Sequence, residues 1–142
     1  MKRLYLCFMF LAIALTAQEN NQPTGPSLVF ESATQDMGLI SKDRKVTTYF
    51  HFSNTGQADL TIAEIKTSCG CTSAQLTKRV YGPGESGRIP VTVDPSRLSG
   101  KLTRSVTVLS DDARFPEQQL RVNLEVENGS TTLSMAEKSL EN

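Results

Sequence analysis

Apolar and polar residues alternate with a period of two through most of the chain between Leu28 and Val126. The clearest case is segment 119–127, where apolar residues at 120, 122, 124 and 126 alternate with polar ones. Such alternation is typical of β-strands that bury one side and expose the other. This span lacks the sustained 3.6-residue period that predicts an amphipathic helix.

Short runs rich in glycine, proline, asparagine and aspartate separate the alternating segments, and these residue types predict turns. About seven short strands are delimited in this way within residues 28–127. Their number and spacing predict an all-β fold, an immunoglobulin-like antiparallel β-sandwich.

Three positions predict local departures from regular strands. Pro90 has no N–H to donate, which indicates an edge position for its strand. The change of phase between Ile62 and Ile65 indicates a β-bulge or bend. Arg104 shares a face with Val106, and we expect this charged side chain to lie near the rim of the sandwich.

Residues 1–17 have the pattern of a secretory signal peptide. Lys2 and Arg3 precede an apolar run of about a dozen residues, and Ala17 offers a small residue for cleavage. The run is shorter than the roughly 20 residues that a membrane span needs. Cys7 lies inside the run, whereas a lipid anchor would require a cysteine at the cleavage site. We therefore expect cleavage after Ala17 and an exported product, either periplasmic or secreted.

On either side of the expected domain the chain is polar. Residues 18–27 predict a flexible lead-in, and residues 128–142 predict a polar C-terminal tail. The mature chain, with about 125 residues, should bury its own core and have no transmembrane span. The full chain has 15 basic and 15 acidic residues, so loss of Lys2 and Arg3 would give a net charge of −2. Without clustered basic residues, we expect no nucleic-acid partner.

The strongest chemical signal is the run Cys69-Gly70-Cys71-Thr72. Residues i and i+2 of a straight strand have Cα atoms about 6.6 Å apart, whereas disulfides prefer about 5.5–6 Å. A bridge between Cys69 and Cys71 therefore requires a bend, and Gly70 would permit one because glycine tolerates positive φ. Such a bridge would close a very short loop and contribute little stability.

Four roles for the cysteine pair remain open at this point. The pair forms a local disulfide or thiol pair that shapes the strand end, or it exchanges thiols with a partner. Alternatively, it captures a soft metal such as Cu(I), or links covalently to another chain. His51, the one histidine, would join a metal site only if the fold places it beside the pair.

Two further patterns look chemical but have simpler interpretations. Residues 82–87 match G-x-G-x-x-G, yet a strand-like segment follows them where a dinucleotide site requires a helix. Asp111, Asp112 and Glu117 offer oxygen ligands for calcium, but aspartates at this spacing more commonly shape a hairpin.

Several segments match the pattern of one known family. They are Phe50-His51-Phe52-Ser53-Asn54-Thr55-Gly56, Leu60-Thr61-Ile62, Thr67-Ser68-Cys69-Gly70-Cys71-Thr72, Pro83-Gly84-Glu85 and Val106-Thr107-Val108-Leu109-Ser110-Asp111-Asp112. Together they resemble a family of exported bacterial Ig-like domains, domain of unknown function 1573. The resemblance covers roughly residues 28–126, and its most specific part is the Cys-Gly-Cys-Thr run. The resemblance implies an extracytoplasmic β-sandwich related to Hydin-type Ig domains, and it implies no activity.

The sequence favours a binding or structural role over catalysis. It has one histidine, no triad pattern and no cofactor fingerprint in a helical context. We expect a non-enzymatic extracytoplasmic module, without a cofactor, that binds another protein or a cell-surface component. The alternative is a thiol redox or copper-handling protein that uses Cys69 and Cys71.

Overall fold

The structure, a computed structural model, describes residues 23–127. The predicted signal peptide, residues 18–22 of the lead-in and the tail 128–142 lie outside the described residues. The strands are β1 (Leu28–Phe30), β2 (Thr34–Ile40), β3 (Val46–Asn54), β4 (Leu60–Thr67), β5 (Thr72–Ala74), β6 (Val80–Tyr81), β7 (Ser86–Val93), β8 (Gly100–Ser110) and β9 (Glu117–Val126). Within the described part of the chain, no helix is long and apolar enough to cross a membrane.

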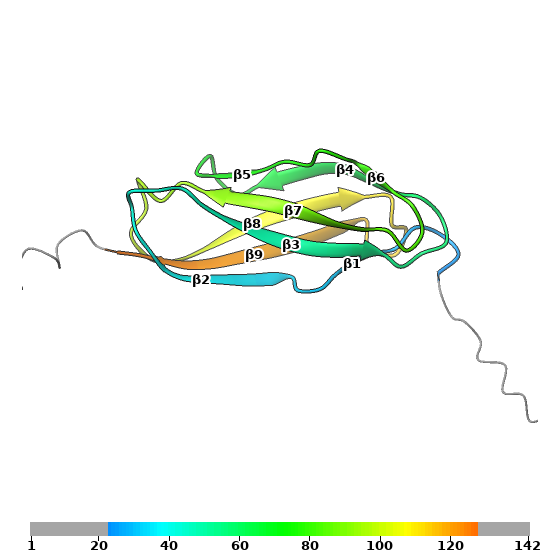
Figure 1. Cartoon of the computed structure of the whole chain (residues 1–142), viewed down its shortest axis with the longest axis horizontal. Helices are drawn as coiled ribbons and strands as arrows, with labels where there is room; N and C mark the ends of the chain where they lie inside the picture. The colour runs from blue at the N-terminus through cyan, green and yellow to red at the C-terminus, as the bar shows by residue number, and fades with distance from the viewer. Residues whose placement is uncertain (1–22, 128–142) are drawn as a thin grey trace, which may run out of the picture.

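These strands form two sheets that pack face to face (Figure 1). One sheet has the order β1-β3-β7-β5 and the other the order β2-β9-β8-β4-β6. The predicted all-β sandwich is confirmed, with nine strands in residues 23–127 rather than about seven. The sequence pattern missed β2, whose residues are mostly exposed. It also missed β5 and β6, because segments of three and two residues are too short to show an alternation.

One strand pair departs from the expected antiparallel arrangement. The chain passes from one sheet to the other between Phe30 and Thr34, so β1 pairs with β3 while β2 pairs with β9. The pairing of β2 with β9 is parallel, and all other pairs are antiparallel. The predicted antiparallel sandwich is therefore confirmed except at this one pair.

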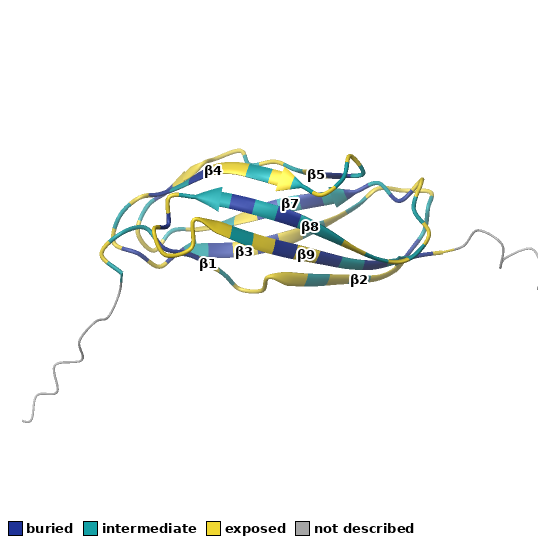
Figure 2. Cartoon of the chain, turned by 180° about the vertical axis from the view of Figure 1, so that it is seen from behind, coloured by how far each residue is buried: buried dark blue, intermediate teal, exposed yellow. Residues whose placement is uncertain are grey.

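The core is the apolar layer between the sheets, and the alternation along each strand supplies it (Figure 2). Phe50 and Phe52 of β3 are 0% and 1% exposed. Phe52 also meets the ring of Tyr81 edge to face, with centroids 4.8 Å apart. Burial of one such side chain contributes about 1.5–3 kcal/mol, so this layer is the main source of stability.

The three predicted local features have different outcomes. A register shift between Ile62 and Glu64 confirms the β-bulge in β4. Arg104 is partly exposed, although its face of β8 continues into the core. Pro90, however, is not on an edge strand, because β7 lies between β3 and β5. Proline is tolerated there because β5 ends at Ala74, which pairs with Val91. No β5 residue therefore lies opposite Pro90 to require the N–H that proline lacks.

The buried end of β3 is held by the side-chain amide of Asn54, which is 0% exposed. Its Oδ1 accepts hydrogen bonds from the N–H groups of Ser27 (3.1 Å) and Gly56 (3.0 Å). Its Nδ2 donates to the carbonyl oxygens of Ala58 (2.8 Å) and Tyr81 (2.9 Å). This single side chain thus joins the segment before β1, the turn after β3, and β6.

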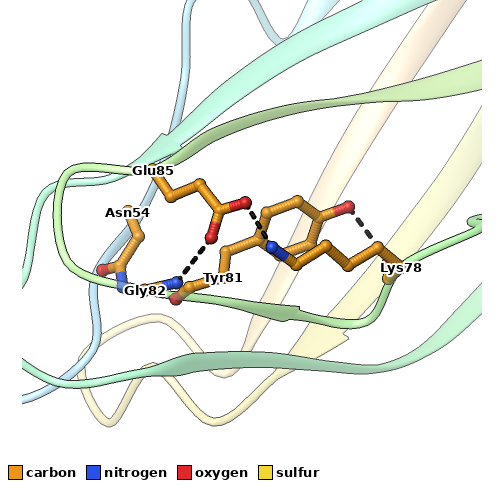
Figure 3. A network of polar contacts seen from close by, with 5 residues as sticks. All are labelled: Asn54, Lys78, Tyr81, Gly82 and Glu85. Atoms are coloured by element: carbon orange, nitrogen blue, oxygen red, sulfur yellow. Dashed lines mark hydrogen bonds and ion pairs between the residues drawn. The ribbon is translucent and has the colours of Figure 1, made fainter.

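The connection from β6 to β7 is a tight turn over residues 82–85 (Figure 3). The Glu85 N–H donates to the Gly82 carbonyl at 3.0 Å, and Gly84 has a φ of 75°, which glycine adopts at little cost. The Glu85 carboxylate accepts the Gly82 N–H at 2.9 Å and pairs with Lys78 Nζ. The bond from Lys78 is the main reason why the pKa of Glu85 is lowered. Residues 82–87 therefore form a turn that leads into a strand and not a nucleotide-binding loop.

Replacement of Asn54 by alanine should lower the free energy of unfolding by about 3 kcal/mol or more, because four backbone groups lose a buried partner. Urea denaturation followed by circular dichroism measures this change. Asn123→Ala is the matched control, because Asn123 accepts one exposed hydrogen bond from Thr103 and should cost less than about 1 kcal/mol. Equal losses for the two variants would contradict the role assigned to Asn54.

Candidate functional site at the Cys69–Cys71 disulfide

Cys69 and Cys71 are joined by a disulfide within a β-turn. Their Cα atoms are 5.3 Å apart, closer than in a straight strand, so the predicted bend is confirmed. The Thr72 N–H donates to the Cys69 carbonyl at 3.2 Å, which closes the turn over residues 69–72. Both cysteines are partly exposed.

The turn lies where the chain crosses between the two sheets. Before it, β4 belongs to the five-stranded sheet; after it, β5 pairs with β7 in the four-stranded sheet (Figure 1). Ser68 is still held by β8, because its N–H donates to the Ser105 carbonyl at 3.0 Å. On the other side, the Asp94 N–H donates to the Cys71 carbonyl at 2.8 Å. The disulfide therefore sits on a connection anchored to both sheets.

Thr72, predicted only as a neighbour in the motif, contacts both sulfur atoms. Its Oγ1 lies 3.5 Å from Cys69 Sγ and 3.8 Å from Cys71 Sγ, and the residue is 4% exposed. A hydroxyl at this place is able to donate a hydrogen bond to either sulfur if the bridge opens. Thr72 is therefore part of the candidate site, because its hydroxyl contacts both sulfur atoms.

Gly70 does not have the positive φ that the sequence argument assigned to it. The positive-φ glycines within the described residues are Gly38, Gly84 and Gly100. A Cβ on Gly70 would meet nothing within 4 Å. The bend is made instead by an ordinary turn, and the explanation of Gly70 by conformational freedom was wrong.

Charged groups lie on both sides of the turn. Asp94 follows β7, and its carboxylate accepts the Ser96 N–H at 3.1 Å and lies 3.5 Å from Lys45 Nζ. The pKa of Asp94 is lowered mainly by its hydrogen bonds with Ser96 and to a smaller degree by Lys45. On the β8 side, Arg104 directly precedes Ser105, the partner of Ser68.

The structure does not bring His51 to the cysteine pair. His51 pairs with Arg88 across β3 and β7, whereas β5 reaches β7 only at residues 91–93. Val46, the β3 residue level with Thr72, is five positions from His51, which is about 16 Å along a strand. Within residues 23–127, no group of three or more His, Cys, Asp or Glu side chains is placed to hold a metal ion.

The acidic residues of the β8–β9 hairpin bind backbone groups. Asp112, which is 1% exposed, accepts the N–H groups of Leu28 (2.9 Å) and Arg114 (2.9 Å). Asp111 accepts the Thr61 N–H at 2.8 Å. These carboxylates hold β1 and the hairpin in place, which is the structural role expected from their turn context.

A model for the family of proteins of unknown function DUF1573 matches residues 28–127. The chain belongs to the DUF1573 family. Its matched span coincides with the two sheets, so the turn at Cys69–Cys71 lies inside the family domain. A search of the curated proteins finds no match to this DUF1573 protein.

Solved structures similar to this DUF1573 protein share its fold at low sequence identity. A protein of unknown function from Porphyromonas gingivalis W83 is 17% identical with a TM-score of 0.66, over 78% of this chain and 51% of that chain. The ASH / PapD-like domain 7 of human CEP192 is 6% identical with a TM-score of 0.61, and the match covers 82% of this chain and 96% of that domain. The YadV chaperone is 12% identical with a TM-score of 0.53, and the match covers 79% of this chain and 58% of the chaperone.

The chain spans only part of some of these proteins. It covers about half, 51%, of the Porphyromonas gingivalis protein and 31% of the Vibrio cholerae VesB protease, which has a TM-score of 0.53 and 20% identity. At such identities the likenesses establish an Ig/PapD-like β-sandwich and nothing about activity.

Gly70→Ala should keep both the disulfide and the fold, with a free energy of unfolding within about 1 kcal/mol of the wild type, since the added methyl group meets open space. Gly87→Ala is the contrast, because its Cβ would lie 2.6 Å from the Tyr81 ring and should destabilise the fold by about 1–3 kcal/mol. Thermal denaturation and a free-thiol assay measure both effects. A free thiol pair in folded Gly70→Ala would show that the turn needs glycine.

Proposed function

We propose that this DUF1573 protein is a non-enzymatic, extracytoplasmic binding module, to which a partner protein adds an extended segment along the free edge of β3. The observation that carries this proposal is a stretch of β3 whose backbone groups have no partner strand. Export is supported by the signal-peptide pattern of residues 1–17, and the disulfide suits an oxidising compartment.

The free part of β3 comprises residues 46–50, called here the open edge. β1 pairs with β3 only at residues 52–54, and no strand within residues 23–127 pairs with the outer side of residues 46–50. The Glu31 N–H donates to the His51 carbonyl, so odd-numbered residues of β3 direct their backbone groups to this side. Thr47 and Tyr49 consequently present two N–H and two C=O groups to an incoming strand.

A groove of about 550 Å³ runs along the open edge, between β2 and β3. Met37, Ile40 and Val46 contribute apolar surface, and Arg44 and Lys45 line the end nearest the β2–β3 loop. Strand addition combines backbone hydrogen bonds with pockets for alternate side chains. An extended segment with alternating apolar residues and an acidic residue near Arg44 fits this edge and groove.

Peptides test the proposal directly. We expect ten-residue peptides that alternate valine or leucine with threonine or glutamate to bind in fluorescence anisotropy, and to slow hydrogen exchange at the Thr47 and Tyr49 amides. Thr47→Pro should weaken binding at least about tenfold, because it removes an edge N–H while the backbone bonds to β7 stay; the exposed hydroxyl contact between Thr47 and Thr92 is lost as well.

Ala74→Pro is the matched control, because β5 is the opposite edge of the same sheet and the Ala74 N–H faces away from β7. This variant should bind the peptides as the wild type does. Unchanged amide exchange at Thr47 and Tyr49, or equal binding by folded Thr47→Pro, would refute strand addition at the open edge.

A second candidate function is thiol–disulfide exchange or, in the reduced state, soft-metal handling at Cys69 and Cys71. The observation that favours it is the size of the ring: a three-residue loop yields only about 1.6 kcal/mol, against about 3 kcal/mol for fifteen residues. Stability is therefore a weak reason for a disulfide in a partly exposed turn. A reactive role explains its position better.

The double variant Cys69→Ser with Cys71→Ser separates the two candidates. We expect it to fold, to lose at most about 2 kcal/mol of unfolding free energy, and to bind the peptides normally. Intact mass after alkylation, with and without reductant, shows whether the wild-type pair is bridged. Loss of peptide binding in the folded double variant would instead favour a function centred on the cysteines.

A further inference from the structure

Arg104 carries a buried guanidinium nitrogen that lacks a hydrogen-bond partner. Its Nε is the one buried side-chain nitrogen or oxygen atom left without a partner in residues 23–127. Arg104 pairs with Val122, which is 0% exposed, on the face of β8 that continues into the core at Val106. An unpaired buried donor is costly, so its retention calls for an explanation beyond packing.

Arg104 and Cys69 lie on either side of the last bonded residues of β4 and β8. Thr67 pairs with Val106, and the next residues, Ser68 and Ser105, share two bonds: Ser68 N–H to the Ser105 carbonyl at 3.0 Å, and Ser105 N–H to Ser68 Oγ at 3.1 Å. Cys69 follows Ser68 directly and begins the turn, and Arg104 directly precedes Ser105.

Both residues are also partly buried. Along the end of β4 and into the turn, residues 64, 66 and 68 are exposed, whereas Ile65, Thr67 and Cys69 are partly buried. Ile65 packs against the core, and Arg104 lies on the side of β8 that carries the buried Val106.

We propose that Arg104 is a positioning residue for thiol–disulfide exchange, which stabilises the Cys69 thiolate when a dithiol reductant opens the bridge. This inference rests on the second candidate function. A guanidinium stays protonated at all ordinary pH values and favours a nearby thiolate.

The exchange proceeds in two balanced steps. A thiolate of the reductant attacks Cys71 Sγ, forms a mixed disulfide with Cys71, and releases Cys69 as the thiolate beside Arg104. The second thiol of the reductant, as a thiolate, then attacks the reductant's sulfur atom in the mixed disulfide and releases Cys71. The reductant leaves as an internal disulfide, and its two electrons reside on the reduced pair. Its two thiol protons pass to solvent when the thiolates form; Cys71 takes one proton up again, and Cys69 stays a thiolate.

The other charged groups near the turn favour Cys69 over Cys71 as the leaving thiolate. Asp94 lies on the Cys71 side, where its N–H bonds the Cys71 carbonyl, and Lys45 pairs with the Asp94 carboxylate. The Asp94 carboxylate disfavours a second negative charge on this side of the turn, and its ion pair with Lys45 reduces the effect. The Thr72 hydroxyl is near both sulfurs and does not distinguish them.

The test compares wild type with Arg104→Gln and Arg104→Lys, and with Arg121→Gln as the matched control. Arg121 is exposed on β9 and its guanidinium donates to Gln119. Each protein, shown to be folded by circular dichroism, is equilibrated in glutathione redox buffers, and the reduced fraction is read by mass after alkylation. Arg104→Gln should lower the equilibrium constant for reduction about tenfold, equal to about 30 mV for a two-electron couple.

A second measurement keeps the inference independent of the redox function. The protein is reduced with tris(2-carboxyethyl)phosphine, and the rate of iodoacetamide alkylation at pH 7 is followed at each cysteine by fragment-ion mass spectrometry. In the wild type we expect Cys69 to react faster than Cys71. In Arg104→Gln, Cys69 should react about fivefold more slowly than in the wild type. In Arg104→Lys and Arg121→Gln, the rate at Cys69 should stay close to that of the wild type.

The outcomes separate the two levels of the proposal. Equal Cys69 alkylation rates in wild type and folded Arg104→Gln would overturn the role of Arg104, whether or not the bridge exchanges. A wild-type bridge that glutathione buffers never open, combined with the expected alkylation rates, would remove the exchange function and leave the thiolate-stabilising contact.

Discussion

Burial of an apolar layer between two sheets requires that backbone groups find partners wherever the chain crosses from one sheet to the other. At the β3–β4 crossing, the Asn54 side chain accepts the N–H of Gly56 and donates to the Ala58 carbonyl. At the β6–β7 crossing, Asn54 and Glu85 bind the groups of the turn. At the β4–β5 crossing, a β-turn bridged by a disulfide serves the same purpose. Polar side chains and a bridged turn thus hold these three crossings.

Alternation together with the turn residues was enough to predict the sandwich, because burial on one face imposes the period of two on long strands such as β9. It did not predict β2, which is mostly exposed, or β5 and β6, which are too short. The parallel pairing of β2 with β9 depends on a tertiary crossing, which the pattern does not show. Pro90 wrongly predicted an edge strand, because a proline indicates one missing hydrogen bond and does not determine the position of the whole strand in the sheet.

The candidate site was visible in part. The cysteine spacing indicated a bend, and the structure has one, but Gly70 was credited with a conformation that it does not adopt. Asn54 was missed, although the alternation of β3 would place its side chain inwards, and an inward asparagine signals a buried polar network. Arg104 was noted as a charge on an apolar face, yet its link to Cys69 depends on the β4–β8 register, which the sequence does not reveal.

The parallel pair of β2 and β9 has a mechanical consequence. The described chain enters at one pole of the sandwich and leaves at the other, and both strands run in that direction (Figure 1). Tension applied to the two ends would slide β2 and β9 past each other along their length. Their interstrand bonds would then carry the load together instead of opening one at a time, so the domain should resist stretching better than its modest size suggests.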